Sequence, residues 1–229
     1  MPVLPPPPTG PGAVESAPER SFGFERLVFF SDAVFAIAIT LLALEIRLPD
    51  GLPATGPITF RALFGALVPH LFAYVLSFLV IGIYWTYHHR IFRYIRAYDR
   101  RLIWLNLYLL MAVAFIPFPT GLLGEHGGEE GPDVLYAATQ AVAGLLAALL
   151  WRHAVVAGLL VPGVAPALIR RTAIRAIGIP LVFLLSIPIA FVAPDVASFF
   201  WLLSAVVGFL SNRLLPVGED TDVAPVPPA

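Results

Sequence analysis

The sequence contains no cysteine and no lysine, and only 13% of its 229 residues are charged. Without cysteine the chain forms neither disulfide bonds nor thiolate metal sites, and it has no cysteine nucleophile. Soluble domains have about 25% charged residues, so the low charge excludes an ordinary water-soluble domain. The formal net charge of −1 gives no bias toward nucleic acid, and we predict no nucleic-acid partner.

Several chemical motifs are also missing from the sequence. It has no glycine-rich phosphate loop, no Ser/His/Asp constellation on a suitable scaffold, and no His-Glu-x-x-His pattern of a zinc hydrolase. It also lacks the Thr-Val-Gly-Tyr-Gly segment whose carbonyl groups form a potassium filter. We therefore predict that the protein is not an enzyme, with no catalytic residues and no cofactor.

Long apolar runs dominate what the sequence does contain, with 59% hydrophobic residues and a mean hydropathy of +0.84. A helix needs about 20 apolar residues to cross the roughly 30 Å of hydrocarbon in a bilayer. Six blocks reach that length: 27–47, 62–87, 102–123, 134–156, 171–193 and 196–214. Their residues are apolar on every face, whereas the strands of a membrane barrel alternate in polarity. We therefore predict an all-α integral membrane protein with six transmembrane helices per chain.

The two ends of the chain differ from the apolar blocks in composition. Residues 1–21 are rich in proline and glycine, and residues 216–229 are acidic and rich in proline. Such segments lack the apolar side chains needed to pack a core. We predict disordered tails on either side of one six-helix transmembrane domain at 22–215. Only Pro194 and Asp195 separate the last two blocks, which predicts a tight helical hairpin.

All fourteen basic residues other than histidine are arginine. Twelve of them fall on one side of a six-helix arrangement, whereas Arg47 and Arg61 fall on the other. Positive residues accumulate in cytoplasmic loops, so we predict that both termini are cytoplasmic. The opposite side carries acids that would raise the local cation concentration: Asp50, Glu125, Glu129, Glu130, Asp133 and Asp195. Solvated loops that only signal topology are the simpler explanation of the same charges.

The first apolar block carries the most informative polar residues, Arg26 and Ser31 followed by Asp32. An ionisable group inside a transmembrane helix is costly and points to function. Asp32 lies six residues after Arg26, about 120° around a helix, so the two cannot pair within it. Each is therefore expected to have a partner on another helix. In the alternative, Ser31 or Asp32 caps a helix that starts near Ala33, which leaves too few residues before Glu45 to cross a bilayer.

An apolar stripe follows Asp32 on the same predicted helix. Ile37, Leu41 and Leu44 recur at helical spacing and share one face, with Thr40 beside them. In a soluble protein such a stripe would belong to the core. Because this helix is apolar all round, its periodicity does not decide whether the stripe faces lipid, protein or a pore.

The end of the second block combines aromatic residues with two adjacent histidines, His88 and His89. Neighbouring helix positions point about 100° apart, so the pair is poorly placed to bind one metal ion. Hydrogen bonding is the role that we expect for them. Trp85 belongs either to the same buried network or to an interfacial aromatic belt. Asn106 and Gln140 in later blocks also need polar partners, and helix packing is the ordinary explanation for them.

Together these residues resemble a known family. The run Arg26-x-x-x-Phe30-Ser31-Asp32 and the apolar residues after it are similar to the first helix of the transmembrane protein 175 family, which comprises endolysosomal potassium channels and their bacterial relatives. Further similarity lies in the second and third blocks, at Trp85-Thr86-Tyr87-His88-His89-Arg90, Asn106-Leu107 and Pro117-Phe118-Pro119-Thr120. The resemblance is specific over about residues 22–124 and only compatible beyond them.

The resemblance implies a homotetramer in which four first helices surround a pore for potassium ions. By position, Ile37 would form the narrowest ring, with Leu41 and Leu44 above it and Thr40 supplying a layer of hydroxyl groups. Apolar side chains rather than backbone carbonyls would then constrict the path, and no metal would bind beyond potassium in transit. A polar network on the cytoplasmic side would hold the pore helix in place. Its expected members are Arg26, Phe30, Ser31, Asp32, Trp85, His88, His89 and Asn106.

The expected function is therefore a potassium-selective, leak-like cation channel. Its expected partners are other copies of the chain, the lipid bilayer and potassium ions. The expected location is a bacterial cytoplasmic membrane, because the sequence has a single channel signature and no organelle-targeting signal. A proton-coupled secondary transporter is the alternative, with Asp32 and His88 as a proton relay. The internal repeats and paired interrupted helices of such transporters are not evident in the sequence.

Overall fold

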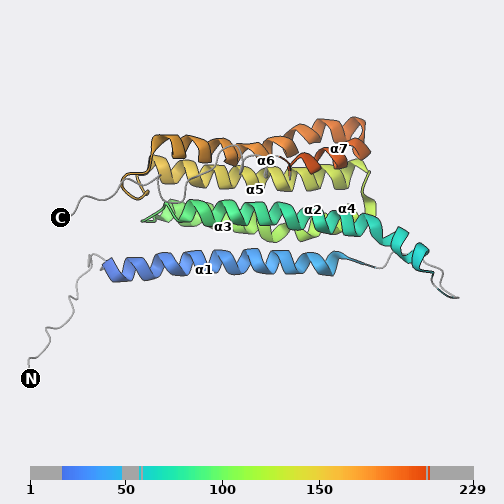
Figure 1. The fold of residues 1–229 in the computed structure, drawn as a ribbon, viewed down its shortest axis with the longest axis horizontal. Helices are drawn as coiled ribbons and strands as arrows, with labels where there is room; N and C mark the ends of the chain where they lie inside the picture. Colours follow the sequence, from blue (N-terminus) through green and yellow to red (C-terminus); the bar gives the residue numbers. More distant parts are fainter. Residues whose placement is uncertain (1–16, 48–56, 58, 205, 207–229) are drawn as a thin grey trace, which may run out of the picture.

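A computed structural model describes residues 17–47, 57, 59–204 and 206 of the chain (Figure 1). The elements in these residues are α1 (Ala17–Leu41), the 3-10 helix η1 (Leu42–Glu45), α2 (Phe60–Phe92), α3 (Arg100–Phe115), α4 (Pro117–His126), α5 (Glu130–Val156), α6 (Pro166–Val192) and α7 (Pro194–Phe200). This confirms the predicted all-α fold class. Helix α1 begins inside the predicted N-terminal tail, and the remainder of both predicted tails lies outside the described residues.

Five helical segments of the described chain are long and apolar enough to cross a membrane. They are Phe22–Glu45, Phe60–Phe92, Arg100–His126, Glu130–Val156 and Pro166–Val192, which coincide with the first five predicted blocks. Of the sixth block, 196–214, the structure describes only the beginning, because the described residues end at 206. There Trp201 donates its Nε1–H to the Ser186 hydroxyl at 2.6 Å. Helices α6 and α7 therefore turn back on each other as the predicted hairpin requires.

The third span consists of two helices, α3 and α4, that meet at Ile116. Pro117 causes the break, because a proline nitrogen cannot donate the hydrogen bond that would continue α3. It stands at the start of α4, where helices accept proline. Thr120 donates its hydroxyl to the Ile116 carbonyl at 2.8 Å, which satisfies an acceptor at the break. The predicted block 102–123 is thus an interrupted span rather than one continuous helix.

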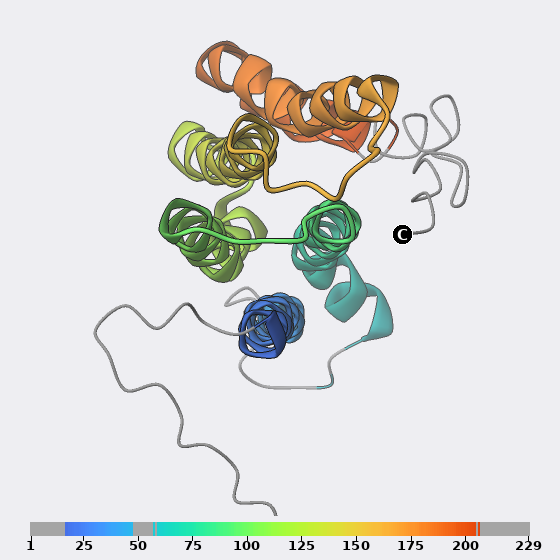
Figure 2. The same cartoon turned by 90° about the vertical axis from the view of Figure 1, so that its left-hand side faces the viewer.

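The helices lie side by side along one direction (Figure 1). Seen from the end of the bundle, α1 lies at one edge, α2 and α3 form a middle layer, and α5 and α6 lie beyond them (Figure 2). Helix α1 packs against α2 and α3, and η1 packs against α2 and α4. Because α1 is an edge helix, only one of its faces is covered by the rest of the described chain.

Helices α5 and α6 approach closely at Gly144. A Cβ atom at this position would lie 2.8 to 2.9 Å from the ring atoms of Pro180. Small residues let the backbones of transmembrane helices come together in this way, which increases van der Waals contact where no hydrophobic effect acts between helices. The absence of a side chain at Gly144 therefore sets the distance between α5 and α6.

We expect Gly144→Ala to lower the free energy of unfolding by about 1–3 kcal/mol, because a rigid proline ring cannot move aside for the new methyl group. Thermal unfolding of the purified protein in detergent measures the effect. Gly65→Ala is the matched control: it lies in α2, and nothing stands within 4 Å of a Cβ there. That variant should melt unchanged or slightly higher, since alanine favours a helix over glycine. An unchanged melting temperature for Gly144→Ala would contradict the close packing.

The end of the bundle where α2 and α5 end and α3 and α6 begin carries many arginines and is called the arginine-rich end below. Two loops are joined there by backbone hydrogen bonds. The N–H of Arg96 donates to the Leu159 carbonyl at 3.0 Å, and the N–H of Val161 donates to the Tyr94 carbonyl at 2.9 Å. These bonds connect the loop after α2 to the loop after α5.

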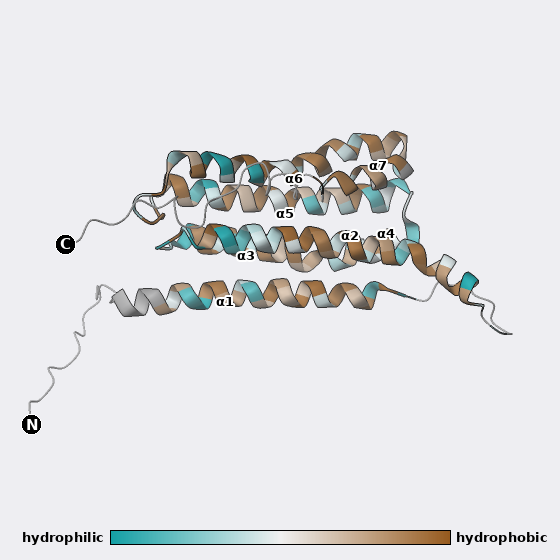
Figure 3. Cartoon of the chain, viewed as in Figure 1, coloured by the Kyte–Doolittle hydropathy of each residue, from teal (hydrophilic) through white to brown (hydrophobic). Residues whose placement is uncertain are grey.

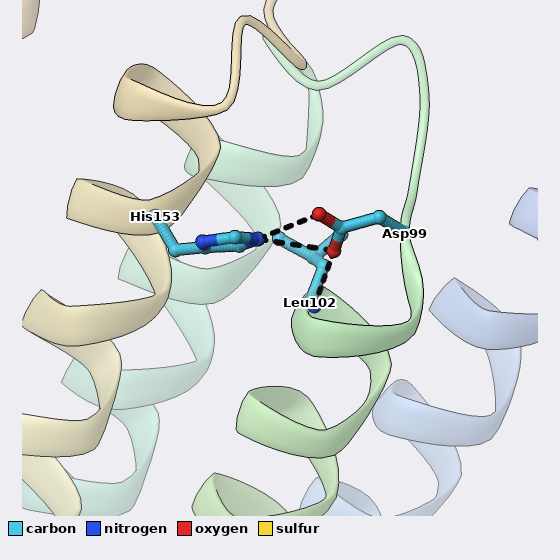
Figure 4. Close-up of polar contacts among 3 residues, drawn as sticks. All are labelled: Asp99, Leu102 and His153. Carbon is cyan, nitrogen blue, oxygen red and sulfur yellow. Dashed lines mark hydrogen bonds and ion pairs between the residues drawn. The ribbon is translucent and has the colours of Figure 1, made fainter.

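Asp99 strengthens the same connection between the two halves of the bundle (Figure 4). As the N-cap of α3, its carboxylate accepts a hydrogen bond from the backbone N–H of Leu102 at 2.7 Å. It also lies 2.9 Å from Nε2 of His153, near the end of α5. One side chain therefore ends a loop, starts a helix and contacts the neighbouring layer.

Stability should depend on pH through Asp99. Burial raises the pKa of its carboxyl, but the Leu102 N–H and His153 outweigh that effect and hold the pKa below its ordinary value of 3.8. A lowered pKa in the fold stabilises it above the ordinary value, and this contribution is lost as pH falls through the folded pKa. We expect the melting-temperature difference between the native chain and Asp99→Asn to shrink below about pH 4. A difference that does not change with pH would exclude a role for the carboxylate charge.

Candidate functional site

The first helix has two different faces in this structure. Its buried residues, each no more than 1% exposed, are Ser31, Phe35, Ala38 and Leu42. The opposite face carries the predicted stripe, with exposed fractions of 57% for Ile37, 39% for Leu41 and 71% for Leu44. Apolar residues run along much of α1, as Figure 3 shows. The stripe is therefore not part of the core of its own chain, and lipid, a partner or a pore must cover it.

The end of the stripe changes its helical geometry. Leu44 belongs to η1, a 3-10 helix, in which side chains three residues apart lie almost above one another. This brings Leu44 close to the line of Leu41. Thr40 is also exposed, and its hydroxyl donates to the Ile37 carbonyl at 2.8 Å. Four of the predicted pore residues thus share one open side of the first helix.

A buried chain of hydrogen bonds holds the reverse side of α1 to the middle layer. The Ser31 hydroxyl donates to the Leu27 carbonyl at 2.8 Å and accepts from Nδ2 of Asn106 at 2.9 Å. Oδ1 of Asn106 lies 2.9 Å from Nε2 of His88. Because an amide oxygen only accepts, Nε2 of His88 is the donor. The network joins α1, α2 and α3, and Ser31, His88 and Asn106 are all buried.

Asp32 makes a separate contact with α2. The indole Nε1–H of Trp85 donates to its carboxylate at 2.9 Å. The ring of His89 stacks on Trp85, with ring centroids 5.5 Å apart. Trp85 therefore contacts the first helix as expected for the network, although it remains 39% exposed. The intramembrane acid has the interhelical partner that the sequence predicted, but the partner is an indole rather than an arginine.

Two aromatic residues outside the predicted network complete the surroundings of His88. Its ring lies 4.2 Å from that of Phe92 and 5.4 Å from that of Phe35, measured between centroids. Phe92 is one helical turn after His88, so spacing alone could have indicated that pair. The contact with Phe35 crosses from α2 to α1, and no local pattern reveals it.

Two expected members of the network lie outside it in the single chain. Arg26 is exposed, and its guanidinium lies 5.9 Å from the ring centroid of Phe22 on the same helix. Phe30 is 52% exposed. The alternative in which Ser31 or Asp32 caps a helix is wrong, because α1 continues through both residues to Leu41. Ser31 and Asp32 therefore lie inside α1 and not at its N-terminus.

Charged residues gather at the other end of the bundle, where η1 meets α4. Arg47 lies 3.6 Å from Glu45 and 3.4 Å from Glu125. Asp133, expected among exposed acids, is fully buried and accepts from the Gly128 N–H at 3.4 Å. It is buried because it lies in the first turn of α5, under the loop that precedes the helix. In the part of the chain that the structure describes, no three His, Asp or Glu residues could hold a metal ion.

A second buried polar cluster joins α2, α4 and α5. The Ser77 hydroxyl lies 2.8 Å from that of Thr120 and 3.0 Å from that of Tyr136. Nearer the arginine-rich end, the Tyr84 hydroxyl donates to the backbone carbonyl of Gln140 at 2.6 Å. This bond involves the backbone of Gln140, so it does not supply the polar partner expected for the side-chain amide. Ser77 and Tyr136 were not predicted from the sequence, because each is a single polar group within an apolar run.

Comparisons with known proteins identify the family of the chain. Residues 26–117 match the family model described as "Endosomal/lysosomal potassium channel TMEM175". A protein of Streptomyces collinus named a potassium channel is 42% identical over 191 residues, which are 80% of this chain and 91% of that relative. The chain belongs to the TMEM175 family. The matched TMEM175 segment contains the exposed stripe and every residue of the Ser31–Asn106–His88 network.

The fold of this TMEM175 chain also matches that of a solved relative. The crystal structure of a lysosomal potassium-selective channel TMEM175 homolog from Chamaesiphon minutus aligns with a TM-score of 0.69 and 28% identity, covering 83% of this chain and 99% of that one. A bovine relative named an endosomal/lysosomal proton channel is 35% identical over 99 residues, 41% of this chain and 20% of its own length. These relatives are named as channels and not as enzymes.

Proposed function

We propose that this protein is a potassium-permeable cation channel whose pore is lined by the first helix in a homotetramer. The observation that carries the proposal is the two-sided construction of α1. One side is fixed to its own chain through Ser31, whereas Ile37, Leu41 and Leu44 stay uncovered. A helix held in this way presents a fixed row of side chains to an opening shared with other copies. The relatives that are named potassium channels support potassium as the permeant ion.

The proposed constriction is a ring of four Ile37 side chains. Apolar rings in a narrow pore gate by dewetting, because water and hydrated ions leave a path that offers no polar contact. Leu41 and Leu44 extend the apolar length, and the Thr40 oxygens supply a polar layer between them. Potassium would pass without a filter of backbone carbonyls. The acids Glu45 and Glu125 at the adjoining end would raise the local cation concentration.

The buried network acts in this proposal as the support of the pore helix. Ser31 lies six residues before Ile37, so its bonds fix the rotation of α1 close to the constriction. A rotation of one residue, about 100°, would turn Ile37 away from the axis. The orientation that we propose places the arginine-rich end and both termini in the cytoplasm of a bacterium, with the chain in the cytoplasmic membrane, because arginines concentrate at that end.

A proton-coupled carrier remains the second candidate, and the bovine relative named a proton channel favours testing protons. In this structure Asp32 bonds to Trp85, whereas His88 bonds to Asn106. The two proposed relay groups therefore have separate hydrogen-bond partners within the described residues. This arrangement favours a structural role for both residues over direct proton exchange.

Potassium flux from liposomes that contain the purified protein tests the function. Valinomycin-treated liposomes define the full signal, and sodium replaces potassium in a parallel series. A channel gives potassium-driven flux without a proton gradient, and Asp32→Asn keeps its ion preference because the amide oxygen still accepts from Trp85. Flux that requires a proton gradient and disappears in Asp32→Asn would instead establish the carrier.

A further inference from the structure

Three arginines from two helices converge at the arginine-rich end. Arg90 is in the last turn of α2, whereas Arg171 and Arg175 are one turn apart near the start of α6. Both Arg90 and Arg171 lie close enough to act electrostatically on Arg175. All three side chains are partly buried, unlike Arg170 and Arg152, which are exposed. Each of the three also has other interactions within the chain.

Convergence of this kind is not needed for membrane topology. The distribution of arginines between the two sides sets orientation whether or not the side chains meet. Bringing like charges together costs free energy, and a pair one turn apart on a helix is itself unfavourable. Three partly buried guanidinium groups therefore form a local positive site that an anion would stabilise, and arginine favours phosphate through paired hydrogen bonds.

The depth of this site matches the edge of a bilayer. Helix α6 has 27 residues, about 40 Å at 1.5 Å per residue, whereas the hydrocarbon layer is about 30 Å thick. Arg175 lies nine residues after Pro166, about 13 Å along the helix. The excess length places the first turns of α6 among lipid headgroups, with Arg175 near the hydrocarbon boundary.

An exposed apolar stripe continues from the arginines along α6. Ile174, Ile177 and Leu181 are each about half exposed and follow the spacing of one helical face. Arg171 lies one turn before Ile174 and Arg175 directly follows it, so both arginines flank the start of the stripe on one side of the helix. Figure 3 shows hydrophilic residues at the start of α6 and apolar residues beyond them. Arginines beside an apolar stripe are complementary to an amphiphile, which has a charged headgroup and an apolar chain. A free ion would use only the arginines.

We infer that Arg90, Arg171 and Arg175 form a binding site for the phosphate of an anionic phospholipid, whose acyl chain lies along Ile174, Ile177 and Leu181. Basic pockets between transmembrane helices at the cytoplasmic side bind such headgroups. The bound lipid would join the end of α2 to the start of α6, two helices that belong to different layers in Figure 2. This inference depends on the membrane location of the helices and not on the proposed pore.

The chain itself offers a competing anion. The acids Glu219, Asp220 and Asp222 lie in the C-terminal segment outside the described residues. They have negative charge, but the sequence around them is polar or proline-rich and offers little to the apolar stripe. The stripe therefore favours the lipid over the segment, and the experiment below separates the two.

Native mass spectrometry of the full chain in mixed micelles of phosphatidylglycerol and phosphatidylcholine tests the inference. We expect retention of phosphatidylglycerol over phosphatidylcholine. The variant Arg171→Gln/Arg175→Gln should lose about thirtyfold in apparent affinity for phosphatidylglycerol. Its matched control is Arg100→Gln/Arg101→Gln, which removes the same charge from exposed positions at the same end and should change little. Equal losses in both variants would show a diffuse positive field and overturn the site.

Further measurements identify the bound anion, and a second variant is available if the first one does not fold. Millimolar inorganic phosphate that displaces the lipid or stabilises the protein equally well would overturn the lipid assignment. Neutralising the acids at 219, 220 and 222 should leave phosphatidylglycerol affinity unchanged, whereas an increase of about tenfold would identify that segment as the occupant. If the double variant fails to fold, Arg90→Gln on α2 replaces it, and unchanged lipid retention in that variant overturns the site. Potassium flux is not the readout, so failure of the proposed channel leaves these outcomes interpretable.

Discussion

Ile37→Asn is expected to raise potassium leak through reconstituted protein at least about tenfold, which corresponds to a barrier lowered by about 1.4 kcal/mol. The asparagine amide offers hydrogen bonds to water, whereas the ring of four isoleucine side chains around the pore offers none. The constriction therefore stays wetted. Asparagine is also shorter than isoleucine, which widens the narrowest point. Both effects act in the same direction. Flux of potassium from loaded liposomes, normalised to the amount of folded protein, measures the change.

The control for Ile37→Asn must separate the pore from general damage. Leu185→Asn introduces the same amide at a similarly exposed aliphatic position on α6, outside the proposed lipid stripe. We expect that variant to leave the leak unchanged, since it lies far from α1 in the sequence of layers seen in Figure 2. Equal leak in both variants would mean that asparagine in any exposed helix disturbs the bilayer. Unchanged conductance in Ile37→Asn would exclude Ile37 as the constriction.

Asn106→Leu is expected to lower the free energy of unfolding by about 1–3 kcal/mol. The substitution keeps the branched shape and the number of heavy atoms of the side chain but leaves the ring N–H of His88 and the hydroxyl of Ser31 without their buried partner. Unsatisfied polar groups are costly inside the bundle, where water cannot replace the lost bonds. Thermal unfolding in detergent measures stability, and the potassium leak of the surviving fraction reports on the rotation of α1.

A double-mutant cycle separates the network from simple loss of packing. Ser31→Ala alone removes the two bonds of the Ser31 hydroxyl, to the Leu27 carbonyl and from Asn106. Because the second bond is also lost in Asn106→Leu, the pair Ser31→Ala/Asn106→Leu should be less destabilised than the sum of the two single variants. Additive losses would mean that the two residues do not act together. Leu109→Ala in the same helix is the packing control, because its side chain is buried but apolar. That variant should lower stability without changing ion leak per folded protein.

The sequence determined the membrane-spanning elements of this protein. About twenty consecutive apolar residues form a helix in a bilayer because a helix satisfies every backbone group within the segment itself. The first five blocks therefore appear in the structure with nearly their predicted limits. Pro117 is visible in the sequence as a kink site, but the sequence did not decide that it ends one helix and starts another.

The same local logic identified most polar residues of the site but not their pairing. A polar side chain in an apolar run must find a partner, so Ser31, Asp32, His88 and Asn106 could be selected from the sequence. Their partners lie 53 to 75 residues away where α1 is involved. Arg26 illustrates the limit: its charge predicted a buried bond, yet the helix position points it away from the bundle.

Which side of α1 is open was decided by tertiary structure alone. The helix is apolar all round, so its sequence contains no period that separates the Phe35 side from the Ile37 side. Packing against α2 and α3 made the choice, through Ser31, Phe35 and Leu42. A sequence that is apolar on every face specifies that the helix crosses the membrane, because every face is favourable against lipid. For that same reason it leaves the direction of each face to the neighbours that pack against it.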